Sequence, residues 1–284
     1  MRKLLKSLLV IGGPATGKTH YGGQLLGRLN KGDNCLRMID APSNISPFEE
    51  VLKRLGQGMT AGHTATEIYD EVKLPIERQN GEKVELVFPD YGGEQVRTMM
   101  EQRQVSIVWR NRLRESGGWL LFIRLDRIRA YEDLLSRPRG REAPQTIESP
   151  EDFKWSDQAY YIELLQLLLY AKGVGVVKRV KDPTLCVVLS CWDELGEDVT
   201  KGVSPATLLS RRMPLLGEFI SSIWTDSYVN VLGLSALGKA LREKEPDEDY
   251  MDYGPENFGY VVLPDGSLSQ DLTLPLALTM ERLP

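Results

Sequence analysis

Apolar runs with the length and bounds of buried β-strands recur along the chain. They span 7–12, 35–40, 83–90, 118–126, 184–193 and 228–236. A further segment, 67–77, alternates apolar and charged residues, which is typical of an edge strand. The turn NGEK joins this segment to the run that follows it, and together they predict a hairpin.

Helical patterns occupy the intervals between these runs. They span 18–29, 46–55, 94–115, 157–173 and 204–224, and the second opens with Ser46 and Glu49, a capping-box signature. Strands that alternate with helices predict an α/β fold, with a mainly parallel six-stranded sheet and helices on both faces. In such a sheet, ligands bind at the carboxyl ends of the strands.

The same pattern divides the chain. A charged, proline-rich stretch at about 127–156 interrupts the alternation and indicates a surface insertion within a domain that spans residues 1–241. Residues 242–257 are acidic and turn-rich, and a Pro-Asp-Gly turn then separates two further apolar stretches. We therefore expect residues 242–284 to form an acidic linker and a short C-terminal β extension.

Composition narrows the classes of function. The 284 residues are 42% apolar and 26% charged, as in ordinary globular proteins, and the net charge of -5 gives no signal for nucleic-acid binding. Three cysteines without metal-type spacing favour a reducing compartment, and no apolar stretch has the length of a membrane span. These features predict a cytoplasmic protein.

A glycine-rich loop follows the first apolar run. The segment GGPATGKT matches the pattern G-x-x-x-x-G-K-[ST], with a predicted strand before it and a predicted helix after it. In this pattern backbone N–H groups point at phosphates, Lys18 reaches the β and γ oxygens, and the Thr19 hydroxyl binds Mg²⁺. The predicted nucleotide-binding residues of the loop are Gly12, Gly13, Pro14, Ala15, Thr16, Gly17, Lys18, Thr19 and His20. The loop does not by itself distinguish GTP from ATP.

A second signal lies at the end of the 83–90 run. Asp90 fits a Mg²⁺ carboxylate, and the stretch D-x-x-G puts Gly93 where its N–H can contact a γ-phosphate. The alternative interpretation is a strand-ending Asp in a Gly-Gly turn. The order of the two signals favours a nucleotide hydrolase.

Two later strands end in residues that resemble the base-binding motifs of GTPases. SCWD ends in Asp193, and SAL comprises Ser235, Ala236 and Leu237. The order of motifs resembles the translation-factor-related class of P-loop GTPases, whose motifs here are [NT]-K-x-D and S-A-[KL]. The resemblance implies that Asp193 accepts from guanine N1 and N2, and that the backbone at Ser235-Ala236 approaches O6.

The match to the third motif is incomplete. Ser190, a predicted nucleotide contact, and Cys191 stand where the family has Asn or Thr and then Lys. That lysine packs along the base, so its loss predicts weaker guanine selectivity, and Trp192 or another side chain is a candidate to stack there. Through D-x-x-G-G-E, a WDE-type motif and a FGYVV…DG tail, the whole chain most resembles the bacterial double-GTPase group, which is associated with conflict or signalling systems.

A GTPase also needs a switch I threonine that joins Mg²⁺ and a residue that orients water. Thr60, Thr64 and Thr66 are the threonine candidates, and Thr66 is preferred because it lies just before the predicted edge strand. Glu94 stands where many GTPases have the water-orienting glutamine. Its charge beside the γ-phosphate predicts slow hydrolysis without a partner, and capping of the next helix is the alternative role. None of the arginines in 94–115 is assigned as catalytic.

These features predict a Mg²⁺-dependent switch that binds GTP, hydrolyses it to GDP and acts on a protein partner. The resemblance implies a bacterial defence system as the setting. The predicted catalytic residues are Lys18, Glu94 and Thr66, and the predicted metal ligands are Thr19, Thr66 and Asp90. The alternatives are an ATPase or nucleotide kinase, and a nucleotide-binding scaffold with little turnover.

Overall fold

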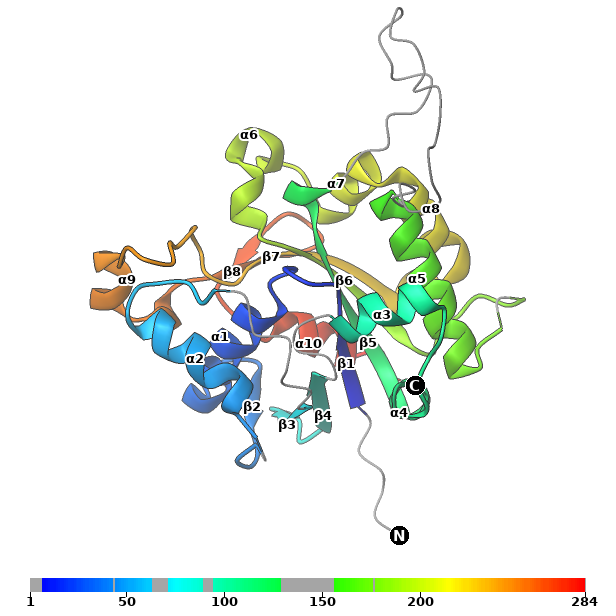
Figure 1. Ribbon diagram of the computed structural model, residues 1–284, viewed down its shortest axis with the longest axis horizontal. Coiled ribbons are helices and arrows are strands. Elements are labelled where there is room, and N and C mark those ends of the chain that lie inside the picture. Colours follow the sequence, from blue (N-terminus) through cyan, green and yellow to red (C-terminus); the bar gives the residue numbers. More distant parts are fainter. Residues whose placement is uncertain are drawn as a thin grey trace, which may run out of the picture.

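The strands of the protein form one mixed sheet (Figure 1). The computed structural model describes residues 7–42, 44–62, 71–88, 94–128, 156–175 and 177–283, without the side chains of Pro47 and Glu94. The strands in these ranges are β1 (Ser7–Ile11), β2 (Leu36–Met38), β3 (Val72–Arg78), β4 (Lys83–Phe88), β5 (Ser116–Arg124), β6 (Thr184–Ser190), β7 (Val229–Ser235), β8 (Tyr260–Val262) and β9 (Leu268–Ser269).

The order of strands across the sheet is β2-β3-β4-β1-β5-β6-β7-β8-β9. The five central strands, β4, β1, β5, β6 and β7, pair in parallel. The pairs at both edges of the sheet are antiparallel. The prediction of six strands is therefore wrong, because the described sheet has nine. The predicted hairpin strand and the C-terminal pair join the same sheet, since their backbone groups find partners along its open edges.

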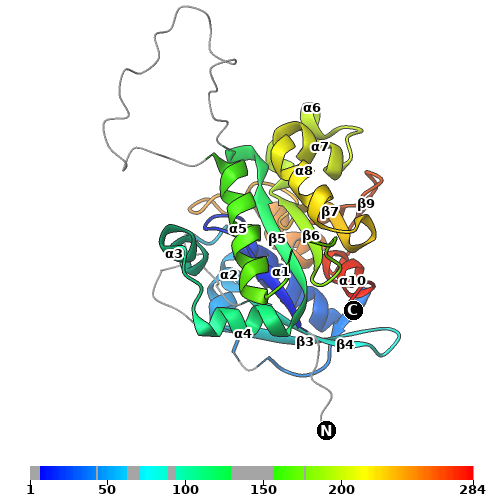
Figure 2. The same cartoon turned by 90° about the vertical axis from the view of Figure 1, so that its right-hand side faces the viewer.

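Helices cover both faces of the sheet (Figures 1 and 2). Side chains of α1, α2 and α10 join the core on one face, and those of α3, α4, α5, α7 and α8 join the core on the other. The helices are α1 (Lys18–Lys31), α2 (Ser46–Gly56), α3 (Glu94–Gln102), α4 (Ile107–Glu115), α5 (Asp157–Lys172), α6 (Glu197–Thr200), α7 (Pro205–Arg212), α8 (Pro214–Ile223), α9 (Glu248–Tyr253) and α10 (Leu274–Met280).

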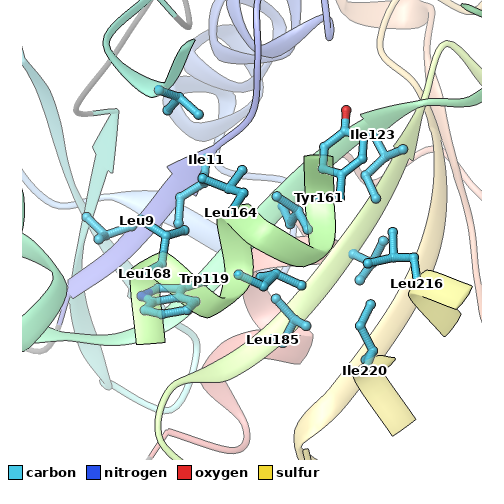
Figure 3. Close-up of a cluster of buried hydrophobic side chains, with 14 of the residues drawn as sticks. Leu9, Ile11, Trp119, Ile123, Tyr161, Leu164, Leu168, Leu185, Leu216 and Ile220 are labelled. Carbon is cyan, nitrogen blue, oxygen red and sulfur yellow. The ribbon is translucent and has the colours of Figure 1, made fainter. Parts of the chain in front are cut away.

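Burial on both faces explains why the central strands are continuous apolar runs. Successive side chains of β1 enter different cores: Leu9 joins the cluster under α5, and Leu8 joins the cluster under α1 and α10. Figure 3 shows the first cluster, where Leu164 and Leu168 of α5 lie near Leu9 and Trp119. The sheet is thus a rigid platform for the loops at its ends.

One predicted helix, 94–115, is interrupted. It forms α3 and α4, and the chain turns between them at Arg103, whose φ of 51° is left-handed. Ser106 begins the second helix as its N-cap, because its hydroxyl accepts from the backbone N–H of Trp109 at 3.3 Å.

The predicted helix 204–224 is also divided. It forms α7 and α8 and breaks at Met213, because the ring of Pro214 disfavours helical backbone in the residue before it. The predicted capping box of α2 is wrong as well, since the Ser46 hydroxyl donates to Asn44 Oδ1 at 2.7 Å and makes no cap bond.

The C-terminal segment completes the sheet rather than standing apart from it. β8 pairs with β7, and Leu272, Leu276 and Met280 enter the core that contains α1. The domain boundary at 241 stays a prediction, and most of the predicted insertion at 127–156 lies outside the described residues. Within the described ranges, every helix is too short or too polar to span a bilayer.

Candidate functional site

A cavity of about 430 Å³ opens where the central parallel strands end. Its walls come from the loop after β1, the ends of β5 and β6, and the loop after β7. Segment 60–62, which follows α2, closes one side. This is the edge at which α/β sheets bind ligands.

The loop after β1 has the backbone that its glycines predict. Gly17 has a φ of 80° and Ala15 a φ of 56°, so the chain curls before α1 begins. Gly12 is needed for close packing, because a Cβ there would lie 2.9 Å from Thr16 Oγ1 and 3.0 Å from Phe122 Cβ. Thr16 Oγ1 in turn donates to the Gly13 carbonyl at 2.8 Å.

Lys18 places a buried ammonium group at this loop. The residue is 4% exposed, and its Nζ donates to the carbonyls of Gly12 and Gly13, at 2.7 Å each. Lys18 and Thr19 both line the cavity at the N-terminus of α1, where the helix dipole favours an anion. The arrangement is that of a phosphate-binding loop.

His20 ties the start of α1 to the segment after α2. Its Nε2 lies 2.8 Å from Thr60 Oγ1, and the two share a hydrogen bond. The Thr60 N–H donates to the Arg242 carbonyl at 3.1 Å. Burial, followed by the charge of Arg124, lowers the pKa of His20 to about 4, so the ring is neutral at pH 7.

The loop after β6 forms the opposite wall of the cavity. Cys191 has a left-handed φ of 52° and caps a short 3-10 helix, Trp192–Leu195, which brings Asp193 to the cavity. Burial raises the pKa of the Cys191 thiol to about 12, so it stays protonated. Trp192 packs down on β7, because a Cβ at Gly233 would lie 2.5 Å from its ring.

The loop after β7 is held by the C-terminal segment. Ala236 and Leu237 line the cavity, whereas Ser235 is fully buried and accepts from the Gly238 N–H at 2.9 Å. Gly259 has a φ of 92°, and a Cβ there would lie 2.6 Å from the Ala236 carbonyl oxygen. Only glycine fits this conformation and contact.

The predicted site residues in the described ranges gather around this cavity. Those that line it are Pro14, Ala15, Thr16, Gly17, Lys18, Thr19, His20, Ser190, Asp193, Ala236 and Leu237. Gly12, Gly13 and Ser235 shape the surrounding loops through the contacts above. Thr64, Thr66, Asp90 and Gly93 lie outside the described residues, as does the side chain of Glu94.

Sequence reasoning missed Arg124 and Arg127, which also line the cavity. The available signal was a pair of charged residues at the end of the buried run 118–126, where such sheets bind ligands: Arg124 lies near its end and Arg127 directly follows it. Thr60, one of the three switch I candidates, borders the cavity as well.

No group of three or more His, Cys, Asp or Glu suited to a metal occurs within the described ranges. The Thr19 hydroxyl at the cavity still fits Mg²⁺ bound with a nucleotide, because Mg²⁺ takes much of its coordination from phosphates and water. The described donors are therefore compatible with that cation.

The family model named Double-GTPase 1 matches residues 9–279. Among curated proteins, none matches this chain significantly. All the loops that line the cavity, and the C-terminal strands β8 and β9, fall within the matched range.

Several solved structures resemble this chain only distantly. The signal recognition particle receptor SRb-GTP/SRX complex of Chaetomium thermophilum is 14% identical with a TM-score of 0.41, over 89% of this chain and 98% of that one. The GTP-bound S. cerevisiae Ski7 GTPase-like domain is 15% identical with a TM-score of 0.46, over 86% and 46%. Bacterial EF-Sec is 12% identical with a TM-score of 0.36, over 82% and 26%. This chain thus spans less than half the length of the last two, and such distant likenesses carry no functional argument.

We predict that Gly259→Ala lowers the free energy of unfolding by about 3 kcal/mol, because strain at positive φ and a clash with the Ala236 carbonyl add together. Gly266→Ala is the matched control. Its φ is 88° but a Cβ there meets open space, so we expect a loss of about 1 kcal/mol. Urea denaturation measures both, and equal losses would show that Gly259 does not support the loop after β7.

Proposed function

Because the chain belongs to the Double-GTPase 1 family, we propose that it is a Mg²⁺-dependent GTP-binding and GTP-hydrolysing switch that acts on a protein partner. Family membership supports GTP binding and hydrolysis as the chemistry. The partner, and a role in a bacterial defence system, are the finer parts of the proposal, and the resemblance of the whole chain to double-GTPases supports them.

One observation carries the proposal: the phosphate-type loop and Asp193 line the same cavity. Its volume of about 430 Å³ is in the range of small-molecule sites. A triphosphate lies against the loop N–H groups and Lys18, and the base lies at Asp193. A carboxylate accepts from both N1–H and N2–H of guanine, whereas adenine offers no such pair of donors.

The reaction needs charge stabilisation more than covalent chemistry. Lys18 offsets the negative charge of the β and γ oxygens, and Thr19, Thr66 and Asp90 are the residues we propose to hold Mg²⁺. When bound, Mg²⁺ neutralises charge that develops on the phosphate oxygens. Gly93 donates its N–H to the γ-phosphate, and Glu94 orients the attacking water.

Slow turnover without a partner follows from Glu94. A carboxylate beside the γ-phosphate is repelled, so its hold on the water is weak. The partner then acts on the two segments that contact the γ-phosphate. One of these segments includes residues 58–62. There, Thr60 shares a hydrogen bond with His20 and donates its N–H to the Arg242 carbonyl, and both bonds hold the segment beside the cavity.

We predict that Lys18→Ala weakens GTP binding about a hundredfold, the scale of a lost charge-assisted hydrogen bond in a buried site. Titration of a fluorescent GTP analogue with Mg²⁺ measures the dissociation constant. Lys31→Ala, at the exposed end of the same helix, is the control and should bind as the wild type does. A Lys18→Ala variant that binds GTP normally would refute the phosphate site.

We also predict that nucleotide state changes backbone protection. Segments 58–68 and 90–100 should exchange amide hydrogens more slowly with a non-hydrolysable GTP analogue than with GDP, because the γ-phosphate and Mg²⁺ hold both. Hydrogen exchange with mass spectrometry measures the difference, and α5 is the internal control. Equal protection in both states, with slow turnover, would instead indicate a nucleotide-binding scaffold. Faster turnover of ATP than of GTP would indicate an ATPase.

A further inference from the structure

Arg124 ends β5 inside the wall of the cavity. Its side chain is 14% exposed, and its Nε donates to Asp126 at 2.9 Å and 3.2 Å to the two carboxylate oxygens. Two further contacts leave the guanidinium in different directions. Nη1 donates to the Ala15 carbonyl at 3.4 Å, and Nη2 donates to a carboxylate oxygen of Glu194.

These contacts connect the two halves of the candidate site. Ala15 belongs to the phosphate loop, and Glu194 is the neighbour of Asp193 in the 3-10 helix after β6. The strand register brings these two loops close together, and Arg124 adds side-chain contacts to both of them. Arginine suits such a link, because its planar fork presents several donors in fixed directions.

The loop after β6 supplies no cation of its own. Cys191 stands where the related motif has lysine, and burial keeps its thiol protonated. Trp192 packs on Gly233 and is 4% exposed, so it is not available to the ligand. The other arginine at the cavity, Arg127, is 63% exposed and pairs with Asp126 at 3.8 Å.

We propose that Arg124 is a positioning residue that fixes the Asp193 loop against the phosphate loop and thereby sets the preference for guanine. The proposal rests on the proposed function of the cavity. A ligand that touches both loops gains from their fixed spacing, because the loops need no further ordering when it binds.

The test compares GDP with inosine diphosphate, which lacks the 2-amino group of guanine. We expect the wild type to favour GDP, and Arg124→Ala to bind GDP about tenfold more weakly, the scale of one charge-assisted contact. In Arg124→Ala, the ratio of the dissociation constant for inosine diphosphate to that for GDP should fall toward one. Arg124→Lys should keep part of the ratio, because a single ammonium reaches one of the two loops but not both.

Glu194→Gln is the second variant. The Glu194 side chain is 37% exposed, so we expect this variant to fold as the wild type does. It should lower the same ratio. The double variant should give the same ratio as Arg124→Ala alone, because both substitutions remove the same contact. Arg78→Ala is the control. It removes an ion pair of similar exposure, to Glu281 at 2.8 Å, and should leave the ratio unchanged.

The outcomes separate this inference from the proposed function. An Arg124→Ala variant with an unchanged ratio and a GDP dissociation constant within twofold of wild type would overturn the inference alone. A wild type that binds neither GDP nor GTP would overturn both. Ligand-free melting temperatures identify variants that do not fold, and in that case Glu194→Gln decides the question.

Discussion

The parallel register of the central strands determines where every part of the site lies. Arg124 of β5 pairs with Ser190 of β6, and Ser190 pairs with Leu234 of β7, so three strands end in one row. Loops that leave adjacent strand ends emerge side by side. The phosphate loop leaves β1 next to this row, because β1 pairs with β5 in parallel. A one-residue shift in any of these pairings would move the side chains of that strand to the opposite face of the sheet.

The C-terminal segment supports both sides of the cavity from behind. On the side proposed to hold the base, Gly259 packs against the loop that carries Ala236. On the phosphate side it holds α1, since Tyr21 Oη donates to the Leu272 carbonyl at 3.0 Å and Arg28 donates to the Gln270 carbonyl at 2.7 Å. The C-terminal segment, which the sequence predicted as a separate extension, thus supports loops at both ends of the cavity.

The sequence predicted the features that depend on local pattern. The buried runs predicted the central strands. The motif from Gly12 to Thr19 predicted the curled loop and Lys18 beside the cavity. The double-GTPase resemblance is confirmed by the family model. The strand count was wrong because it left out the hairpin strand β3 and the C-terminal pair β8 and β9. β8 joins the sheet by pairing with β7, a contact that no local pattern contains. The role of Arg124 was missed because its partners Ala15 and Glu194 are far from it in the sequence, and only the strand register brings them together. The helix break at Arg103 depends on one residue's backbone conformation within an otherwise helical pattern.

The central claim is that the cavity selects a guanine nucleotide through Asp193. Its most direct test is the shift in melting temperature of the wild type and of Asp193→Ala with GTP or ATP, each with Mg²⁺. We predict a larger shift with GTP than with ATP in the wild type, since an unpaired buried acceptor costs about 1–3 kcal/mol with adenine. The difference should disappear in Asp193→Ala. Equal shifts with both nucleotides in the wild type, unchanged in the variant, would contradict the claim.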